Sequence, residues 1–189
     1  MKAFITYITL VLLMLLSWTI VETAHLVAPV NAPGSAQQDG KTNEALKASL
    51  PMEVRQAMDR AASVYQEPLR GARWSKSFVL NGSEHPLYQL QGVNERGKKI
   101  EMEVTSAGRI IEVEEHDIAP GEVPGAVLDA VKTKLPHFKT KQLEAIYQND
   151  KPQPVCFGIE GIDASGKKRE LYISADGKTF LTEPVEDAQ

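Results

Sequence analysis

The chain has 189 residues, and its 21 Lys and Arg residues against 25 Asp and Glu residues give a formal net charge of −4. Proteins that bind nucleic acids are commonly strongly basic, so this balance argues against nucleic acid as a partner. A hydrophobic fraction of 42% and a charged fraction of 24% are typical of a folded globular protein, which excludes a wholly disordered chain and a multi-span membrane protein.

The N-terminal segment has the pattern of an export signal. Lys2 precedes a largely apolar stretch at residues 3–21, whose length lies between that of a secretory h-region and that of a membrane-spanning helix. We therefore expect residues 1–24 to be a signal peptide or an N-terminal anchor. The protein is expected to be exported: periplasmic, secreted, or held at a membrane only through an uncleaved N-terminal segment. The candidate cleavage positions are Ala24, Ala28 and Ala32.

Residues 25–50 are predicted to be a flexible linker, because they show no sustained apolar period. Such a segment cannot bury enough apolar surface to offset the cost of ordering its backbone, which is about 1–2 kcal/mol per residue. The folded part of the chain is therefore expected to begin near Pro51.

The rest of the chain contains an internal repeat. Residues 88–114 align with residues 157–183 at a constant offset of 69 without a gap, and seven of the 27 pairs are identical. We expect a first repeat at residues 51–118, a second repeat at residues 119–184 and a tail at residues 185–189. The identical pairs are Gly92/Gly161, Gly97/Gly166, Lys98/Lys167, Lys99/Lys168, Glu101/Glu170, Gly108/Gly177 and Glu114/Glu183.

Each repeat is predicted to begin with a helix. Five residues of the first repeat have the spacing i, i+3, i+4, i+7 and i+11, which places them on one side of a helix. The second repeat has the same pattern at an offset of 70, and a proline suits its first helical turn because the missing N–H would have no partner there. The two sets are Val54, Ala57, Met58, Ala61 and Tyr65, and Pro124, Val127, Leu128, Val131 and Leu135.

The residues that follow each helix have the period of two that is typical of strands. Ile100, Met102 and Val104 alternate with polar residues, and the corresponding residues of the second repeat do the same. Short turns that contain glycine separate these strands, and residues 74–80 and 140–147 are further candidates for strands. The predicted fold class is α+β, with two tandem repeats, each one helix packed on a four-stranded antiparallel β-meander.

Two stretches of the second repeat, VPGAVLDAVKTKLPHFK and GIEGIDASGKKRELYISADGKTFL, resemble the PepSY-like, β-lactamase-inhibitor-like family. The stretches VRQAMDRAASVYQ and GVNERGKKIEMEVTSAGRII of the first repeat are similar to the same pattern. The first repeat departs from it at Ala107, which replaces the aspartate of the last turn, and at Gln66, which replaces the proline after the helix. The resemblance covers residues 51–184.

The resemblance implies an exported, non-catalytic binding module without a cofactor. Relatives include inhibitory propeptide segments of secreted metalloproteases and proteins that bind a β-lactamase through a concave sheet. The expected role is therefore that of an inhibitor or regulator of an exported protein such as a hydrolase. One alternative is an envelope module that binds a small ligand or a peptide, and another is an exported hydrolase, which would need a nucleophile and a base.

Alternation predicts that one sheet face is polar and acidic. Antiparallel sheets commonly bury one face and leave the other in water, so we expect this face to be open, with an exposed Tyr172 as its aromatic anchor. A solvated face without a binding role is an equally open interpretation. The candidate binding residues are Gln89, Gln91, Glu101, Glu103, Glu160, Glu170 and Tyr172.

No metal site is predicted from the sequence. Metal sites usually show a local spacing such as HxxxH or CxxC, which this sequence lacks. The histidines are therefore interpreted as surface residues: His25, His85, His116 and His137.

No catalytic site is predicted either. Cys156 lies among apolar residues, where the thiolate of a nucleophile is disfavoured, so it is interpreted as a buried packing residue. Glu112, Glu114 and Glu115 could suggest paired carboxylates, but a catalytic pair needs a partly dry pocket. We interpret these three residues as a solvated strand end.

Overall fold

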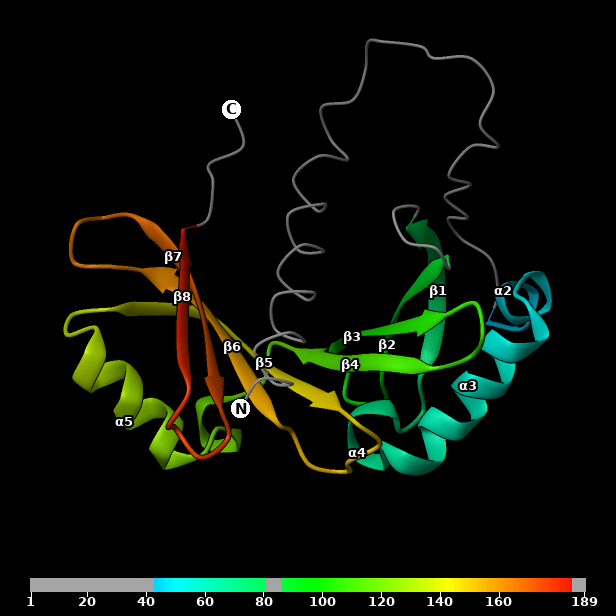
Figure 1. Ribbon diagram of the computed structural model, residues 1–189, viewed down its shortest axis with the longest axis horizontal. Helices are drawn as coiled ribbons and strands as arrows, with labels where there is room; N and C mark the ends of the chain where they lie inside the picture. The colour runs from blue at the N-terminus through cyan, green and yellow to red at the C-terminus, as the bar shows by residue number, and fades with distance from the viewer. Residues whose placement is uncertain (1–42, 81–85, 185–189) are drawn as a thin grey trace, which may run out of the picture. The chain divides into compact units, whose positions relative to one another are not determined.

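Figure 1 shows the computed structural model, which describes residues 43–80 and 86–184. The predicted signal or anchor at residues 1–24 and the tail at residues 185–189 lie outside the described residues. The first half of the described chain contains the helices α2 (Asn43–Ser49), α3 (Met52–Val64) and α4 (Gln66–Leu69) and the strands β1 (Arg73–Leu80), β2 (Leu87–Val93), β3 (Lys99–Thr105) and β4 (Ile110–His116). The second half contains the 3₁₀ helix η1 (Pro120–Glu122), the helix α5 (Gly125–Lys134) and the strands β5 (Lys139–Gln148), β6 (Cys156–Ile162), β7 (Lys168–Ser174) and β8 (Phe180–Pro184). None of the helices in these ranges is long and apolar enough to cross a membrane.

The strands of the described residues form one eight-stranded antiparallel sheet, in which each strand pairs with its neighbour in the sequence. The predicted α+β class and the antiparallel meander are confirmed. The sequence predicted two four-stranded sheets, but in the structure β4 pairs with β5 and joins them, with Val113 opposite Tyr147 and His116 opposite Glu144. This pairing satisfies backbone N–H and C=O groups that would otherwise lie on two open edges.

The helices α3 and α5 pack on the same face of the sheet (Figure 1). The apolar residues of α3 are buried against the alternating apolar residues of β2 to β4, among them Leu90, Met102 and Val113. Val127 and Val131 of α5 belong to the same core cluster. Because residues that pair directly across neighbouring strands share a face, the polar residues between these apolar ones lie on the opposite face of the sheet.

The folded part begins earlier than predicted, because residues 43–49 form α2. Leu46 is fully buried and Leu50 is nearly so, and both belong to the core. Oδ1 of Asn43 accepts a hydrogen bond from the backbone N–H of Trp74 at 3.1 Å, which ties α2 to β1. The prediction that the linker extends to residue 50 was therefore wrong. Leu46 is the buried residue of α2 and Leu50 directly follows its last residue, so the segment is too short for a periodic apolar pattern to stand out.

The helices α3 and α5 start and end in similar ways. Pro51 and Pro124 are the residues that precede them. At the other end, the N–H of Tyr65 donates to the carbonyl of Ala61 and the N–H of Leu135 donates to that of Val131, each at 2.8 Å. With 13 residues, α3 is three residues longer than the 10-residue α5, so the difference is about one turn at the N-terminal end.

The turn after β2 and the turn after β6 contain glycine, as the sequence predicted. Gly97 has φ 74° and Gly166 has φ 84°. This backbone conformation is unfavourable for residues with a Cβ, so glycine at these two positions allows the short hairpins that the sheet requires.

Candidate functional site

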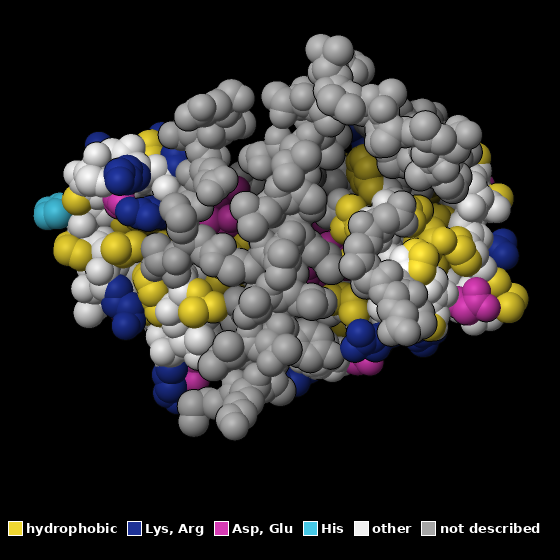
Figure 2. All heavy atoms as spheres, turned by 45° about the horizontal axis from the view of Figure 1, so that its top comes forward, with side chains coloured by type: hydrophobic (Ala, Val, Ile, Leu, Met, Phe, Trp, Pro, Cys, Tyr) yellow, Lys and Arg dark blue, Asp and Glu magenta, His cyan; other side chains and the backbone are white. Residues whose placement is uncertain are grey.

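The face of the sheet opposite α3 and α5 carries most of the acidic side chains of the strands. In the first half Gln91 pairs with Glu101, and in the second half Glu160 pairs with Glu170. Figure 2 shows acidic side chains near the middle of its view, between two groups of hydrophobic side chains. We call this surface the acidic face and define it by the side chains of Gln89, Gln91, Glu101, Glu103, Glu112, Glu114, His116, Glu144, Gln148, Glu160, Glu170 and Tyr172.

The seven residues selected from the sequence all lie on the acidic face, but they differ in exposure. Glu160 is exposed, and Glu170 and the two glutamines are partly exposed. Glu101 and Glu103 are only 5% exposed each. The prediction that these residues share one face of the sheet is thus confirmed, and their role in binding stays a prediction.

The expectation of an exposed aromatic anchor was wrong. Tyr172 lies on the predicted face, but it is 2% exposed, and its hydroxyl donates a hydrogen bond to Oε1 of Glu170 at 2.6 Å. Alternation along a strand indicates the face on which a side chain lies, but it carries no information on how deeply that side chain is buried.

The centre of the acidic face comes from β4 and β5, and the sequence predicted no binding residue on either strand. Glu112 and Glu114 were interpreted as a solvated strand end and His116 as a surface residue, but all three are buried. The pairing of β4 with β5 explains the error, because it moves β4 from the end of a small sheet to the middle of a large one. The available signal was the alternation of these residues with Ile111 and Val113.

His116 contacts three carboxylates. Its Nδ1 lies 3.0 Å from Oε2 of Glu144, on the neighbouring strand. Its Nε2 lies 3.4 Å from Oε2 of Glu114 and 3.5 Å from Oε1 of Glu101, and neither contact is a hydrogen bond. Burial by itself lowers the pKa of His116, but Glu114 and Glu144 raise it to about 10. The imidazole ring is therefore positively charged at neutral pH.

Two carboxyl groups of the acidic face, those of Glu103 and Glu112, are harder to ionise than ordinary glutamates. Burial, with the added repulsion of Glu114 and Glu101, raises the pKa of Glu103 to about 8. Burial also raises the pKa of Glu112, next to Glu114 and Glu103. Both shifts arise chiefly because burial removes water from the charged form, and repulsion between neighbouring carboxylates adds to them.

The acidic face also holds buried polar atoms that lack a hydrogen-bond partner. Buried polar groups are usually paired, so such atoms mark places where a bound group would be favourable. The atoms of this kind among the described residues are Nε2 of Gln91, Oε2 of Glu103, Nε2 of His116 and Oε1 of Glu144.

Three side chains at the centre are close enough to share a metal ion. One ligand atom each of Glu101, Glu114 and His116 lies within 4.8 Å of the other two. No metal site was predicted from the sequence, because these three residues do not have the local spacing of common metal ligands. Here the ligands come from two paired strands, so their proximity depends on strand register.

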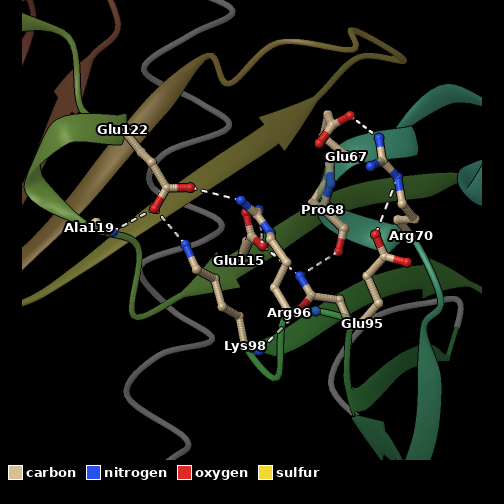
Figure 3. A network of polar contacts seen from close by, with 10 residues as sticks. Glu67, Pro68, Arg70, Glu95, Arg96, Lys98, Glu115, Ala119 and Glu122 are labelled. Carbon is tan, nitrogen blue, oxygen red and sulfur yellow. Dashed lines mark hydrogen bonds and ion pairs between the residues drawn. The ribbon is translucent and has the colours of Figure 1, made fainter.

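A second polar network lies away from the acidic face and joins the β2–β3 turn to the β4–α5 connection (Figure 3). The buried Glu115 accepts a hydrogen bond from Nδ2 of Asn94 at 2.5 Å and pairs with Arg96. Both Arg96 and Lys98 form ion pairs with Glu122. Nη1 of Arg96 lies 2.8 Å from Oε1 of Glu122, and Nζ of Lys98 lies 2.6 Å from Oε2. The interpretation of Glu115 as part of a solvated strand end was wrong. The charges of this network neutralise each other, which indicates a structural role.

Cys156 is buried, as predicted. Burial raises the pKa of its thiol to about 12, with a further contribution from the negative charge of Glu144. A thiolate is the reactive form of cysteine, so this residue is not suited to nucleophilic attack.

Comparison with known proteins supports the fold. No protein-family model matches the sequence, and no curated protein matches it at a significant level. A DUF2874 family protein from Bacteroides ovatus ATCC 8483 is similar in structure, with a TM-score of 0.54 and 13% identity over 74% of this chain and 90% of that chain. A candidate periplasmic protein from Bacteroides eggerthii DSM 20697 has a TM-score of 0.52 and 14% identity over 72% and 89% of the two chains.

A BLIP-like protein from Bacteroides fragilis NCTC 9343 is also similar, with a TM-score of 0.49 and 18% identity over 70% of this chain and 86% of that chain. At 13 and 14% identity, the first two structures show that this chain shares their fold. None of the three is described as a PepSY protein.

Proposed function

We propose that the protein is an exported, non-catalytic binding module that acts as an inhibitor or regulator of an exported protein, such as a hydrolase. The observation that carries the proposal is the gathering of acidic and amide side chains on one sheet face, while α3 and α5 pack on the other. The exposed Glu160 and the partly exposed Glu170 belong to this surface. Complementary charge would direct a partner with a basic surface to it.

The chain is also proposed to consist of two copies of one unit, at residues 51–118 and 119–184. The pairing of β2 with β3 and that of β6 with β7 support this, because their registers coincide after a shift of 69 residues. Leu90 pairs with Met102 as Ile159 pairs with Leu171.

The contacts of His116 disfavour one form of the alternative, an exported hydrolase in which a histidine activates a hydroxyl or thiol nucleophile. A histidine that activates a nucleophile contacts a hydroxyl or a thiol. The side chains within ion-pair distance of His116 are the carboxylates of Glu101, Glu114 and Glu144. The alternative of an envelope module that binds a small ligand or peptide predicts a melting temperature that rises with ligand concentration in a thermal-shift screen.

A photo-crosslinking experiment in the source cells tests the proposed surface. A photoreactive residue replaces Glu160 on the acidic face in one variant and the exposed Gln56 of α3 in a second, matched variant. We expect a defined cross-linked partner from position 160 and not from position 56. Adding Glu170→Lys should abolish that product, whereas adding Glu53→Lys on α3 should leave it unchanged. Equal cross-linking from both positions, or a product that survives Glu170→Lys, would contradict the proposal.

A further inference from the structure

We propose that Glu101, Glu114 and His116 form a binding site for a divalent transition-metal cation, best matched by Zn²⁺. The inference does not depend on the proposed partner. The three residues lie at the buried centre of the acidic face, whereas Glu160 and Glu170 are more exposed.

The sheet register brings the three ligands together. Glu101 of β3 pairs directly with Glu114 of β4, and His116 follows Glu114 by two residues on the same face. Zinc bonds to imidazole nitrogen and carboxylate oxygen measure about 2.0–2.2 Å, so ligand atoms around a tetrahedral zinc lie roughly 3.4 Å apart. Nε2 of His116 lies 3.4 Å from Oε2 of Glu114 and 3.5 Å from Oε1 of Glu101. Both separations from Nε2 therefore match tetrahedral coordination, and one oxygen of each carboxylate lies within 4.8 Å of the other.

An independent observation is the state of the His116 ring. Its side chain is 8% exposed, and Nε2 points at the two carboxylates without making a hydrogen bond. A buried ring nitrogen without a hydrogen-bond partner is unfavourable. A metal ion at this position would displace the proton of Nε2 to solvent and take its place between the two carboxylates.

Nδ1, the other ring nitrogen of His116, lies next to a carboxylate, as in many known metal sites. Histidine ligands usually donate their second N–H to a carboxylate, which orients the ring toward the metal. Nδ1 of His116 lies 3.0 Å from Oε2 of Glu144, its direct partner across the β4–β5 pair. Gly158 makes room for this arrangement, because a Cβ at position 158 would overlap the carboxylate of Glu144. Glu144 is thus a positioning residue for the proposed metal ligand.

The chemical types of the three proposed ligands indicate which class of cation the site would bind. An imidazole with two carboxylates suits Zn²⁺ and similar first-row metals, whereas Ca²⁺ and Mg²⁺ prefer oxygen ligands alone. Two carboxylates balance the charge of a divalent ion, and three protein ligands leave a fourth position for water or a bound group. Lys99 competes for the site, since its Nζ lies 2.6 Å from Oε1 of Glu101.

Isothermal titration calorimetry of the full chain with ZnCl₂, after removal of metals with a chelator, tests the proposal. We expect one ion to bind per chain, and Glu101→Gln and Glu114→Gln each to weaken binding by at least about tenfold. Glutamine has nearly the same shape as glutamate, and circular dichroism of each variant checks that it remains folded. The matched control is Glu112→Gln on β4, whose carboxylate accepts a hydrogen bond from Gln148 at 3.1 Å. This variant should retain zinc affinity within about threefold.

A second readout is thermal unfolding, because an ion that binds only the folded state raises the melting temperature. ZnCl₂ should raise the melting temperature of the wild type and of Glu112→Gln, and raise that of Glu101→Gln and Glu114→Gln much less. The proposal would be overturned by a wild type that binds no zinc, by zinc binding that is unchanged in both ligand variants, or by Mg²⁺ binding as tight as that of Zn²⁺.

Discussion

His116 and Glu144 lie directly opposite each other in the β4–β5 pair, and Nδ1 of His116 lies 3.0 Å from Oε2 of Glu144. One residue belongs to the first half of the described chain and the other to the second half. The centre of the acidic face therefore requires both halves of the sheet and could not be assembled from either half alone.

Replacing the charged ring of His116 should destabilise the protein. In His116→Ala, the carboxylates of Glu101, Glu114 and Glu144 lose the positive charge between them, and breaking a buried ion pair typically costs about 3–5 kcal/mol. Urea unfolding measures this loss. The control is His137→Asn at an exposed site with positive φ, which asparagine tolerates, and its effect should stay within about 0.5 kcal/mol. Equal unfolding free energies for His116→Ala and the wild type would contradict the interpretation.

Glu170 should make stability fall as the pH rises. Burial raises its pKa from 4.5 to about 7, with a contribution from the negative charges of Glu144 and Glu160, although the hydrogen bond from Tyr172 acts in the opposite direction. The folded state thus binds this proton more tightly than the unfolded chain. Its stabilising contribution is complete below pH 4.5 and is lost as the pH rises through about 7.

The variant Glu170→Gln should lack this contribution to the pH dependence. Relative to the wild type, its free energy of unfolding should increase between pH 5 and pH 8 by on the order of 2 kcal/mol. Urea unfolding at several pH values measures the difference. A difference that is constant over this range would show that the folded state leaves the titration of Glu170 unperturbed.

Gly158 should be sensitive to the addition of a single methyl group. The Cβ of Gly158→Ala would displace the carboxylate of Glu144, and overpacking of this kind typically costs about 1–3 kcal/mol. The matched control is Gly121→Ala, where a Cβ would meet no atom within 4 Å. If both substitutions change the melting temperature equally, Gly158 is not needed to accommodate Glu144.

Leu46 should contribute to stability although it precedes the predicted start of the fold. It is fully buried, and truncation of a buried leucine to alanine typically costs about 2–5 kcal/mol. Chemical denaturation of Leu46→Ala measures this cost, and Glu44→Ala on the exposed side of α2 should be close to neutral. A neutral Leu46→Ala would mean that α2 does not stabilise the core.

The helices and strands could be predicted from sequence where the signal is local. The strands predicted at residues 74–80 and 140–147 appear as Arg73–Leu80 and Lys139–Gln148, because alternation and turn residues mark their ends. The helix α2 was missed because seven residues span only two turns.

The candidate site was predicted only in part. Alternation placed Glu101 and Glu170 on the correct face, but the pairing of β4 with β5 depends on residues about thirty positions apart and has no local signal. His116 and Glu114 were misinterpreted for this reason. The burial of Tyr172 depends on its surroundings in the folded sheet, which no short sequence pattern reports.

The most direct test of the central claim, that the acidic face is the binding surface, is the dissociation constant of the cross-linked partner for purified variants. The double variant Glu160→Lys/Glu170→Lys should bind at least about tenfold more weakly than the wild type, because like charges across an interface are repulsive. The helix-side variant Glu53→Lys should bind as the wild type does. An unchanged dissociation constant for the double variant, or an equal loss in Glu53→Lys, would contradict the claim.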